Sequence, residues 1–144
     1  MLEAALSCFD ACDVFVAAAA PADYAPVEVA PSKIKKAIAG ADWVVRLKET
    51  PDVLATVAAR KKGRFVVGFA AETEQTVENA REKLARKRLD LIVANNVTQE
   101  GAGFEADTNI VTMIRSDGET EMLPKMTKRD VAEKILDAVV RGIK

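Results

Sequence analysis

Residues 64–96 read RFVVGFAAETEQTVENAREKLARKRLDLIVANN, and this stretch decides the fold. Two short expected strands, 64–69 and 91–94, which are apolar throughout except for Arg64, enclose a segment, 76–88, whose apolar residues recur at helical spacing. Apolar runs without alternation are typical of strands that are buried on both faces of a parallel sheet. The stretch therefore predicts a strand–helix–strand unit with two parallel strands.

The flanking sequence extends this pattern on both sides. We expect helices at 2–9, from 50 to about 61 and at 127–141, strands at 14–19 and 43–47, and a hairpin of 109–114 and 120–123. Thr50-Pro51-Asp52 is typical of a helix start, Thr127 of a capping box, and three prolines make 21–32 irregular. The prediction is an α/β fold, a Rossmann-like three-layer sandwich with a mostly parallel sheet and an antiparallel edge hairpin. It lacks the N-terminal strand, glycine-rich turn and helix with which such sheets open.

Length and charge exclude several classes of protein. The 144 residues fit one domain, and 21 basic against 22 acidic residues give a net charge of −1, which argues against a nucleic-acid binder. The longest apolar run, 14–20, is shorter than the 18 or so residues that span a bilayer. No basic segment precedes an apolar stretch at the N-terminus, so we expect a cytoplasmic protein with no membrane partner.

Two absences restrict the chemistry. The chain has no histidine, which excludes Ser-His and Cys-His nucleophile pairs and zinc sites with histidine ligands. Its two cysteines, Cys8 and Cys12, are expected to be small buried residues rather than a disulfide. Any chemistry must use lysine, arginine, acidic or amide side chains, backbone groups or a bound metal ion.

Small and polar residues follow three of the expected strands, at 19–23, 70–73 and 95–96. Ligands of open α/β sheets bind at the carboxyl ends of the strands, so the coincidence favours a ligand site, although turn capping or tight packing explains each residue alone. In the helix 76–88, Lys83 and Lys87 lie beside the apolar stripe of Val77, Ala80 and Leu84. Such lysines either extend their stems along the core or bind a buried anion. The residues alone therefore indicate an anionic small molecule such as a nucleotide.

Five motifs occur in a characteristic order and spacing. They are AAAPADY at 18–24, KIKK at 33–36, VVGFAAET at 66–73, DLIVANNV at 90–97, and Phe104 with Asp107 and Asn109. Together they closely resemble the bacterial CTP-dependent phosphopantothenoylcysteine synthetases. In many bacteria this ligase domain is the C-terminal half of a bifunctional coenzyme A biosynthesis protein, whose N-terminal half is a flavin-dependent decarboxylase.

The resemblance implies a two-step reaction. The carboxylate of 4′-phosphopantothenate attacks the α-phosphate of CTP, which gives an acyl-cytidylate and pyrophosphate, and the amine of cysteine then displaces CMP to form an amide. The substrates are CTP, 4′-phosphopantothenate and cysteine, and Mg²⁺ is the implied metal. FMN belongs only to the decarboxylase domain, which is absent here.

The resemblance also implies roles for individual residues. Lys33 is the leading candidate for the catalytic cation, carried on a flap that helps to close the site. Ala19, Ala20 and Asp23 border the acyl or nucleotide site, and the family pattern leaves open whether the catalytic Asp23 faces metal or substrate. The nucleotide contacts implied beside Asp23 and Lys33 are Pro51, Asp52, Val53, Leu54, Phe69, Lys83 and Lys87.

The sequence departs from the family at its start. Synthetase domains begin with a strand and a glycine-rich turn, followed by an asparagine needed for turnover of the acyl-cytidylate. We therefore expect residues 1–144 to represent about the last two thirds of such a domain, incomplete as an enzyme. The alternative is a non-catalytic nucleotide-binding or dimerisation module, whereas a NAD-dependent oxidoreductase is disfavoured because no G-x-G-x-x-G occurs. We expect a homodimer formed through the edge hairpin and the flap.

Overall fold

The computed structural model describes residues 1–35, 42–96, 98–99 and 106–143. The chain divides into two compact units. The larger one comprises Met1–Ala18 and Val53–Lys144, and the smaller one comprises Ala19–Asp52. Within the described residues, no helix is long and apolar enough to cross a membrane.

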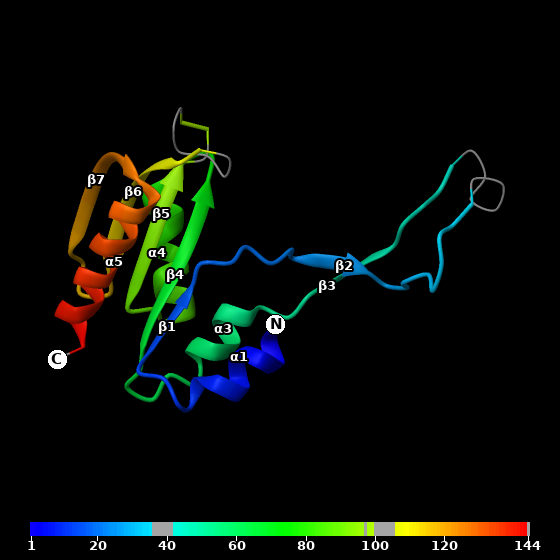
Figure 1. Cartoon of the computed structure of the whole chain (residues 1–144), viewed down its shortest axis with the longest axis horizontal. Coiled ribbons are helices and arrows are strands. Elements are labelled where there is room, and N and C mark those ends of the chain that lie inside the picture. The colour runs from blue at the N-terminus through cyan, green and yellow to red at the C-terminus, as the bar shows by residue number, and fades with distance from the viewer. Residues whose placement is uncertain (36–41, 97, 100–105, 144) are drawn as a thin grey trace. The chain divides into compact units, whose positions relative to one another are not determined.

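A five-stranded mixed sheet forms the centre of the larger unit (Figure 1). Its strands are β1 (Val14–Ala17), β4 (Phe65–Glu72), β5 (Leu91–Asn96), β6 (Thr108–Arg115) and β7 (Thr120–Thr127), in the order β1-β4-β5-β6-β7. β1, β4 and β5 are parallel, and β6 and β7 add an antiparallel hairpin at one edge. The expected strand–helix–strand unit, the parallel sheet and the edge hairpin are thereby confirmed.

Helices cover both faces of this sheet, so the predicted three-layer architecture is confirmed. On one face, α1 (Leu2–Phe9), α3 (Val53–Ala58) and α4 (Thr76–Lys87) enclose a core with Val66, Ala70 and Ile92. On the other face, α5 (Lys128–Gly142) packs on Val67, Val93 and Met113 (Figure 1). Successive residues of β4 and β5 alternate between these two cores because side chains of a strand point to opposite faces.

Local signals set the ends of the helices. The hydroxyl of Thr127 accepts a hydrogen bond from the amide of Asp130 at 3.1 Å, so α5 begins with the predicted cap. α4 begins after Gln75 and ends before Arg88, and both of these residues adopt left-handed backbone angles, with φ of 46° and 54°. The turn between β6 and β7 contains Gly118 in a left-handed conformation, with φ of 96°.

The smaller unit overturns two expectations. Its two strands, β2 (Tyr24–Pro26) and β3 (Leu47–Glu49), form a separate antiparallel pair. Residues 43–47 are therefore not a strand of the main sheet, and the proline-rich segment is not wholly irregular. The apolar run 43–47 resembles a buried strand but is largely exposed, and Pro26 is tolerated because a two-stranded ribbon leaves amide positions unpaired.

Two smaller expectations are also wrong. The hydroxyl of Thr50 donates to the carbonyl of Ala22 at 2.6 Å instead of capping a helix, and α3 begins only at Val53 and ends at Ala58. Cys8 is exposed and Cys12 is half-buried, so neither is a fully buried residue. α1 has only eight residues and is covered on one side, which leaves Cys8 on its open face.

Candidate functional site

The connection between β4 and α4 lies at the carboxyl edge of the parallel strands, where the sequence predicts a ligand. β4 ends at Glu72 and α4 begins at Thr76, so three residues make the turn. The amide nitrogen of Asn79 donates to the Glu72 carboxylate at 3.3 Å and to the Glu74 carbonyl at 3.1 Å. The side chain of Asn79, in the first turn of α4, thus connects the helix to this edge of the sheet.

Lys83 and Lys87 lie on α4 as predicted, and both are half-buried, whereas Arg81, Arg86 and Arg88 are exposed. The ammonium of Lys83 donates to the backbone carbonyl of Phe69 at 2.9 Å, so its stem runs along the sheet toward the middle of β4. α4 returns toward the amino ends of the strands. Lys87 therefore sits one helical turn, about 5.4 Å, further from the carboxyl edge than Lys83.

The ring and the backbone carbonyl of Phe69 make contacts with elements on opposite faces of the sheet. Its ring is partly buried against the α5-side core, whereas its carbonyl receives the lysine of α4, which belongs to the opposite face. The structure therefore brings the ammonium of Lys83 to the backbone carbonyl of Phe69.

Val53 and Leu54 form the start of α3 and pack against the α4-side core. A Cβ atom added at Gly68 would meet Leu54 Cδ2 at 2.9 Å and Leu89 Cδ1 at 2.7 Å, so Gly68 is required by this packing. The side chains of Val53 and Leu54 are half-buried and pack against this core.

Asn96 caps the turn that follows β5. Its side-chain oxygen accepts a hydrogen bond from the amide of Thr98 at 2.9 Å and another from the hydroxyl of Thr98 at 2.6 Å. Asn95 is half-buried and lies opposite Ala71 of β4 in the parallel ladder. Of the fifth motif, Phe104 lies outside the described residues.

The smaller unit brings together two predicted segments that are far apart in the sequence. The amide of Thr50 donates to the carbonyl of Asp23 at 2.8 Å, and its hydroxyl donates to the neighbouring Ala22. Asp23 therefore lies beside the segment that continues into Pro51 and Asp52. Thr50 was not predicted to connect these segments, because the Thr-Pro-Asp pattern is also typical of a helix start.

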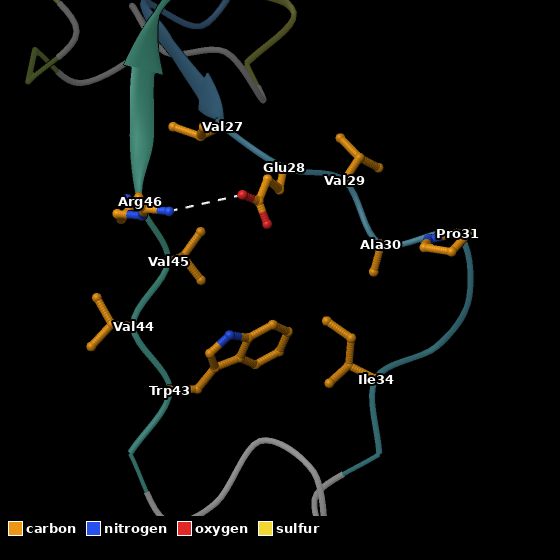
Figure 2. Close-up of a pocket in the computed structure, with 10 residues that line it drawn as sticks. All are labelled: Val27, Glu28, Val29, Ala30, Pro31, Ile34, Trp43, Val44, Val45 and Arg46. Carbon is orange, nitrogen blue, oxygen red and sulfur yellow. Dashed lines mark ion pairs between the residues drawn. The ribbon is translucent and has the colours of Figure 1, made fainter.

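We call the described residues 24–35 and 42–49 of the smaller unit the arm, and Asp23 with Thr50 the base of the arm. Several of the predicted site residues in this unit are exposed. Ala19, Ala20, Asp23 and Lys33 are all exposed, and Lys33 lies between β2 and β3 in the sequence. The arm contains a pocket of about 430 Å³, in which the Trp43 indole and the Ile34 side chain point toward each other (Figure 2). Glu28 and Arg46 form an exposed ion pair at 3.8 Å in the lining of this pocket.

The part of the chain that the structure describes was searched for clusters of side chains that could bind a metal ion. No group of three or more Cys, Asp or Glu side chains there could hold a metal ion. These residues therefore form no site in which three or more protein carboxylates coordinate the expected Mg²⁺.

These features define a Rossmann-like α/β domain. Two lysines lie along α4, a helix that packs on the mostly parallel sheet, and the smaller unit has a two-stranded arm. The chain belongs to the family described as the DNA/pantothenate metabolism flavoprotein C-terminal domain, whose match spans residues 1–143.

Named relatives agree with this assignment. Coenzyme A biosynthesis bifunctional protein CoaBC of Bacillus subtilis (strain 168) is 48% identical over 139 residues, which are 96% of this chain and 34% of the relative. CoaBC of Escherichia coli (strain K12) is 44% identical over 130 residues, covering 89% of this chain and 32% of that protein. The crystal structure of the C-terminal domain of a CoaBC protein superimposes with a TM-score of 0.75 at 37% identity, over 96% of this chain and 58% of that one. The chain thus spans about a third of the length of these curated relatives.

Proposed function

We propose that this chain is the ligase part of a coenzyme A biosynthesis protein. It would join 4′-phosphopantothenate and cysteine through an acyl-cytidylate formed from CTP. The observation that carries the proposal is membership of the CoaBC C-terminal family over nearly the whole chain, with 48% identity to the Bacillus subtilis protein. The half-buried Lys83 at the parallel strands supports an anionic ligand at that place.

The proposed chemistry suits a chain without histidine. In the first step a carboxylate oxygen bonds to the α-phosphorus of CTP and the bond to pyrophosphate breaks. In the second step the amine of cysteine bonds to the acyl carbon, CMP leaves, and the amine loses a proton. Charge moves chiefly among phosphate and carboxylate oxygens, which lysine ammonium groups can stabilise without an imidazole.

Each unit contributes separate residues to this proposal. In the larger unit, Lys83 exchanges the Phe69 carbonyl for a nucleotide phosphate, and Lys87 adds positive potential one turn away. In the smaller unit, Lys33 is the cation that acts on the reacting groups, and Asp23 with Pro51 and Asp52 contacts substrate at the base of the arm. Mg²⁺ is proposed only as part of the nucleotide substrate, bound by its phosphate oxygens.

The first experiment measures pyrophosphate release by the folded 144-residue chain with CTP, Mg²⁺ and 4′-phosphopantothenate, with ATP in parallel. Release that requires CTP, followed by CMP release when cysteine is added, is expected for the ligase. Release with ATP alone would overturn the choice of nucleotide. If a folded sample released no pyrophosphate, the proposal that this chain catalyses the first step on its own would be overturned.

The second experiment tests the role of Lys33. The substitution Lys33→Gln is expected to slow pyrophosphate release by about 100-fold, because one group that stabilises developing charge is worth that much in many enzymes. Lys48→Gln is the matched control, since Lys48 is an exposed lysine in β3 of the same unit and is expected to leave the rate unchanged within about twofold. Equal rates for the two variants would remove Lys33 from the mechanism.

A second candidate function, dimerisation, is favoured by the apolar surface of the arm. In the described part of the smaller unit, the exposed large hydrophobic residues are Tyr24, Val27, Val29, Ile34, Trp43, Val44, Val45 and Leu47. A two-stranded ribbon is marginal in water by itself, and clustered exposed apolar residues mark an interaction surface. The occupant that fits is the arm of a second copy, whose oppositely charged Glu28 and Arg46 would meet the same pair across a two-fold axis.

The edge hairpin is a weaker candidate for the dimer contact. The strand β7 contains Pro124 and the charged residues Glu121 and Lys125. A proline and charged side chains discourage an edge strand from pairing with another chain. Sedimentation of the chain is therefore expected to show a dimer that Trp43→Ser converts to monomer. Met122→Ser, which changes an exposed methionine of β7, is the control and is expected to remain dimeric. A dimer that survives Trp43→Ser and is lost in Met122→Ser would assign the interface to the hairpin instead.

A further inference from the structure

The turn from β4 to α4 has an unusual backbone for its sequence. Gln75, the residue before α4, adopts a left-handed conformation with φ of 46° and ψ of 41°, and its side chain makes no capping hydrogen bond. Non-glycine residues adopt this conformation rarely, and it persists where the surroundings hold it in place. The structure around the turn therefore holds this conformation in place.

Asn79 makes two side-chain hydrogen bonds around this turn. It lies one helical turn into α4 and is half-buried, and its amide nitrogen reaches both the Glu72 carboxylate and the Glu74 carbonyl. Both partners only accept hydrogen bonds, so the nitrogen of the amide must face them. The backbone amide of Asn79 also donates to the carbonyl of Gln75 at 3.0 Å. Side chain and backbone of one residue thus span the whole turn.

Lys83 follows Asn79 by one turn on the same flank of α4. Its ammonium donates to the carbonyl of Phe69, three residues before Glu72, so the two side chains attach α4 to the end of β4 at neighbouring points. If Lys83 transfers its hydrogen bond to a phosphate, the attachment through Asn79 still holds the helix against the strand. The position of the lysine then depends on the core contacts of α4 and on the hydrogen bonds of the asparagine.

We propose that Asn79 is a positioning residue, which fixes the β4–α4 turn and the register of α4 so that Lys83 meets the nucleotide phosphate at a defined place. The inference rests on the nucleotide role proposed above for Lys83. It adds a residue that contacts no substrate and that acts through the turn and the lysine.

Two variants of the full chain separate positioning from folding. Asn79→Ala removes both donated hydrogen bonds, and Asn79→Asp keeps the shape but sets a carboxylate against Glu72. Both are expected to raise the dissociation constant and the KM for CTP by about tenfold, with kcat at saturating CTP changed by less than about threefold. Glu82→Gln, an exposed substitution on the same helix, is the control and is expected to bind CTP like the wild type.

A double variant provides the rescue. In Asn79→Asp combined with Glu72→Gln the donor and acceptor exchange places, so one of the two hydrogen bonds is restored. This variant is expected to recover a large part of the lost CTP affinity. A double variant that binds CTP more weakly than Asn79→Asp would contradict the proposal.

Hydrogen exchange of the ligand-free chain tests the geometry without the nucleotide. The amides of residues 79–82, which make the first hydrogen bonds of α4, are expected to exchange faster in Asn79→Ala than in the wild type, whereas those of β5 keep their rate. Unchanged exchange in 79–82 would show that Asn79 does not hold the turn. A lowered melting temperature with unaltered CTP affinity would reduce Asn79 to a structural residue. A wild type that binds no CTP would overturn the proposed function together with this inference, whereas equal CTP binding by wild type and variants would overturn the inference alone.

Discussion

Asp90, the residue before β5, connects the α3–β4 loop to β4, and its replacement is the sharpest test of how the larger unit is held together. One carboxylate oxygen accepts from the ammonium of Lys61 at 2.8 Å, and the other accepts from the backbone amide of Val66 at 2.8 Å. The side chains of Lys61 and Asp90 are only 29% and 21% exposed, and Val66 is fully buried. Asp90→Ala would leave both donors without this acceptor.

The magnitude follows from these two contacts. A hydrogen bond to a charged group contributes about 1.5–3 kcal/mol, and a buried amide left without a partner costs about 1–3 kcal/mol. Because the two losses share one carboxylate and are not additive, we expect Asp90→Ala to lower the free energy of unfolding by about 3 kcal/mol. Asp90→Asn keeps an acceptor for Val66 and loses the charge, so about 1 kcal/mol is expected.

Urea unfolding followed by circular dichroism measures both variants at pH 7. The control is Asp117→Ala, which removes an acidic side chain from an exposed turn and is expected to cost less than half of the Asp90→Ala effect. The slope of the free energy against urea should stay constant, since the folded core is the same. Equal losses for Asp90→Ala and Asp117→Ala would refute the assignment of Asp90 as a buried connector.

Three further predictions concern single residues. The amide of Glu119 and the guanidinium of Arg115 hold the pKa of Asp117 below its usual 3.8. The contribution of the Asp117 carboxylate to the stability of the fold is therefore present above pH 3.8 and is lost as the pH falls through the lower pKa of the folded state. An NMR titration that finds a pKa of 3.8 or higher for Asp117 would contradict this. Thr127→Ala removes the α5 cap and should cost about 1 kcal/mol in urea unfolding, whereas Thr127→Ser, which keeps the hydroxyl, should cost much less. Gly68→Ala would force apart Leu54 and Leu89 at a cost of about 1–3 kcal/mol, and a smaller loss in a Leu89→Ala background is the outcome that identifies the clash.

Local patterns were sufficient where a segment completes its own interactions. The helix 76–88 and the Thr127 cap were predicted within a residue, because spacing and capping depend on neighbours in the chain. The parallel strands were predicted because segments buried on both faces need continuous apolar runs. The flank of α4 that carries Lys83 and Lys87 followed from the same helical spacing, although the partner of Lys83 did not.

Segments that find their partners far away in the chain were predicted poorly. Residues 43–47 have the composition of a buried strand, yet they lie in an exposed arm, because burial depends on what packs against a segment. Thr50 was interpreted as a helix cap, since its contact with Ala22 spans 28 residues and leaves no local signal. The same holds for Asp90, whose partners lie 29 and 24 residues away.

The sequence by itself determined the class of the fold, the order of its elements in the larger unit and, through the motif order, the family. These properties depend on apolar periodicity and on residue types, which are written along the chain. The tertiary structure alone decided that residues 24–26 and 47–49 pair, that Asp23 lies beside Thr50, and that Asn79 and Lys83 attach α4 to β4. Hydrogen bonds between distant segments exist only after packing has brought donor and acceptor within about 3 Å, and no local pattern specifies that meeting.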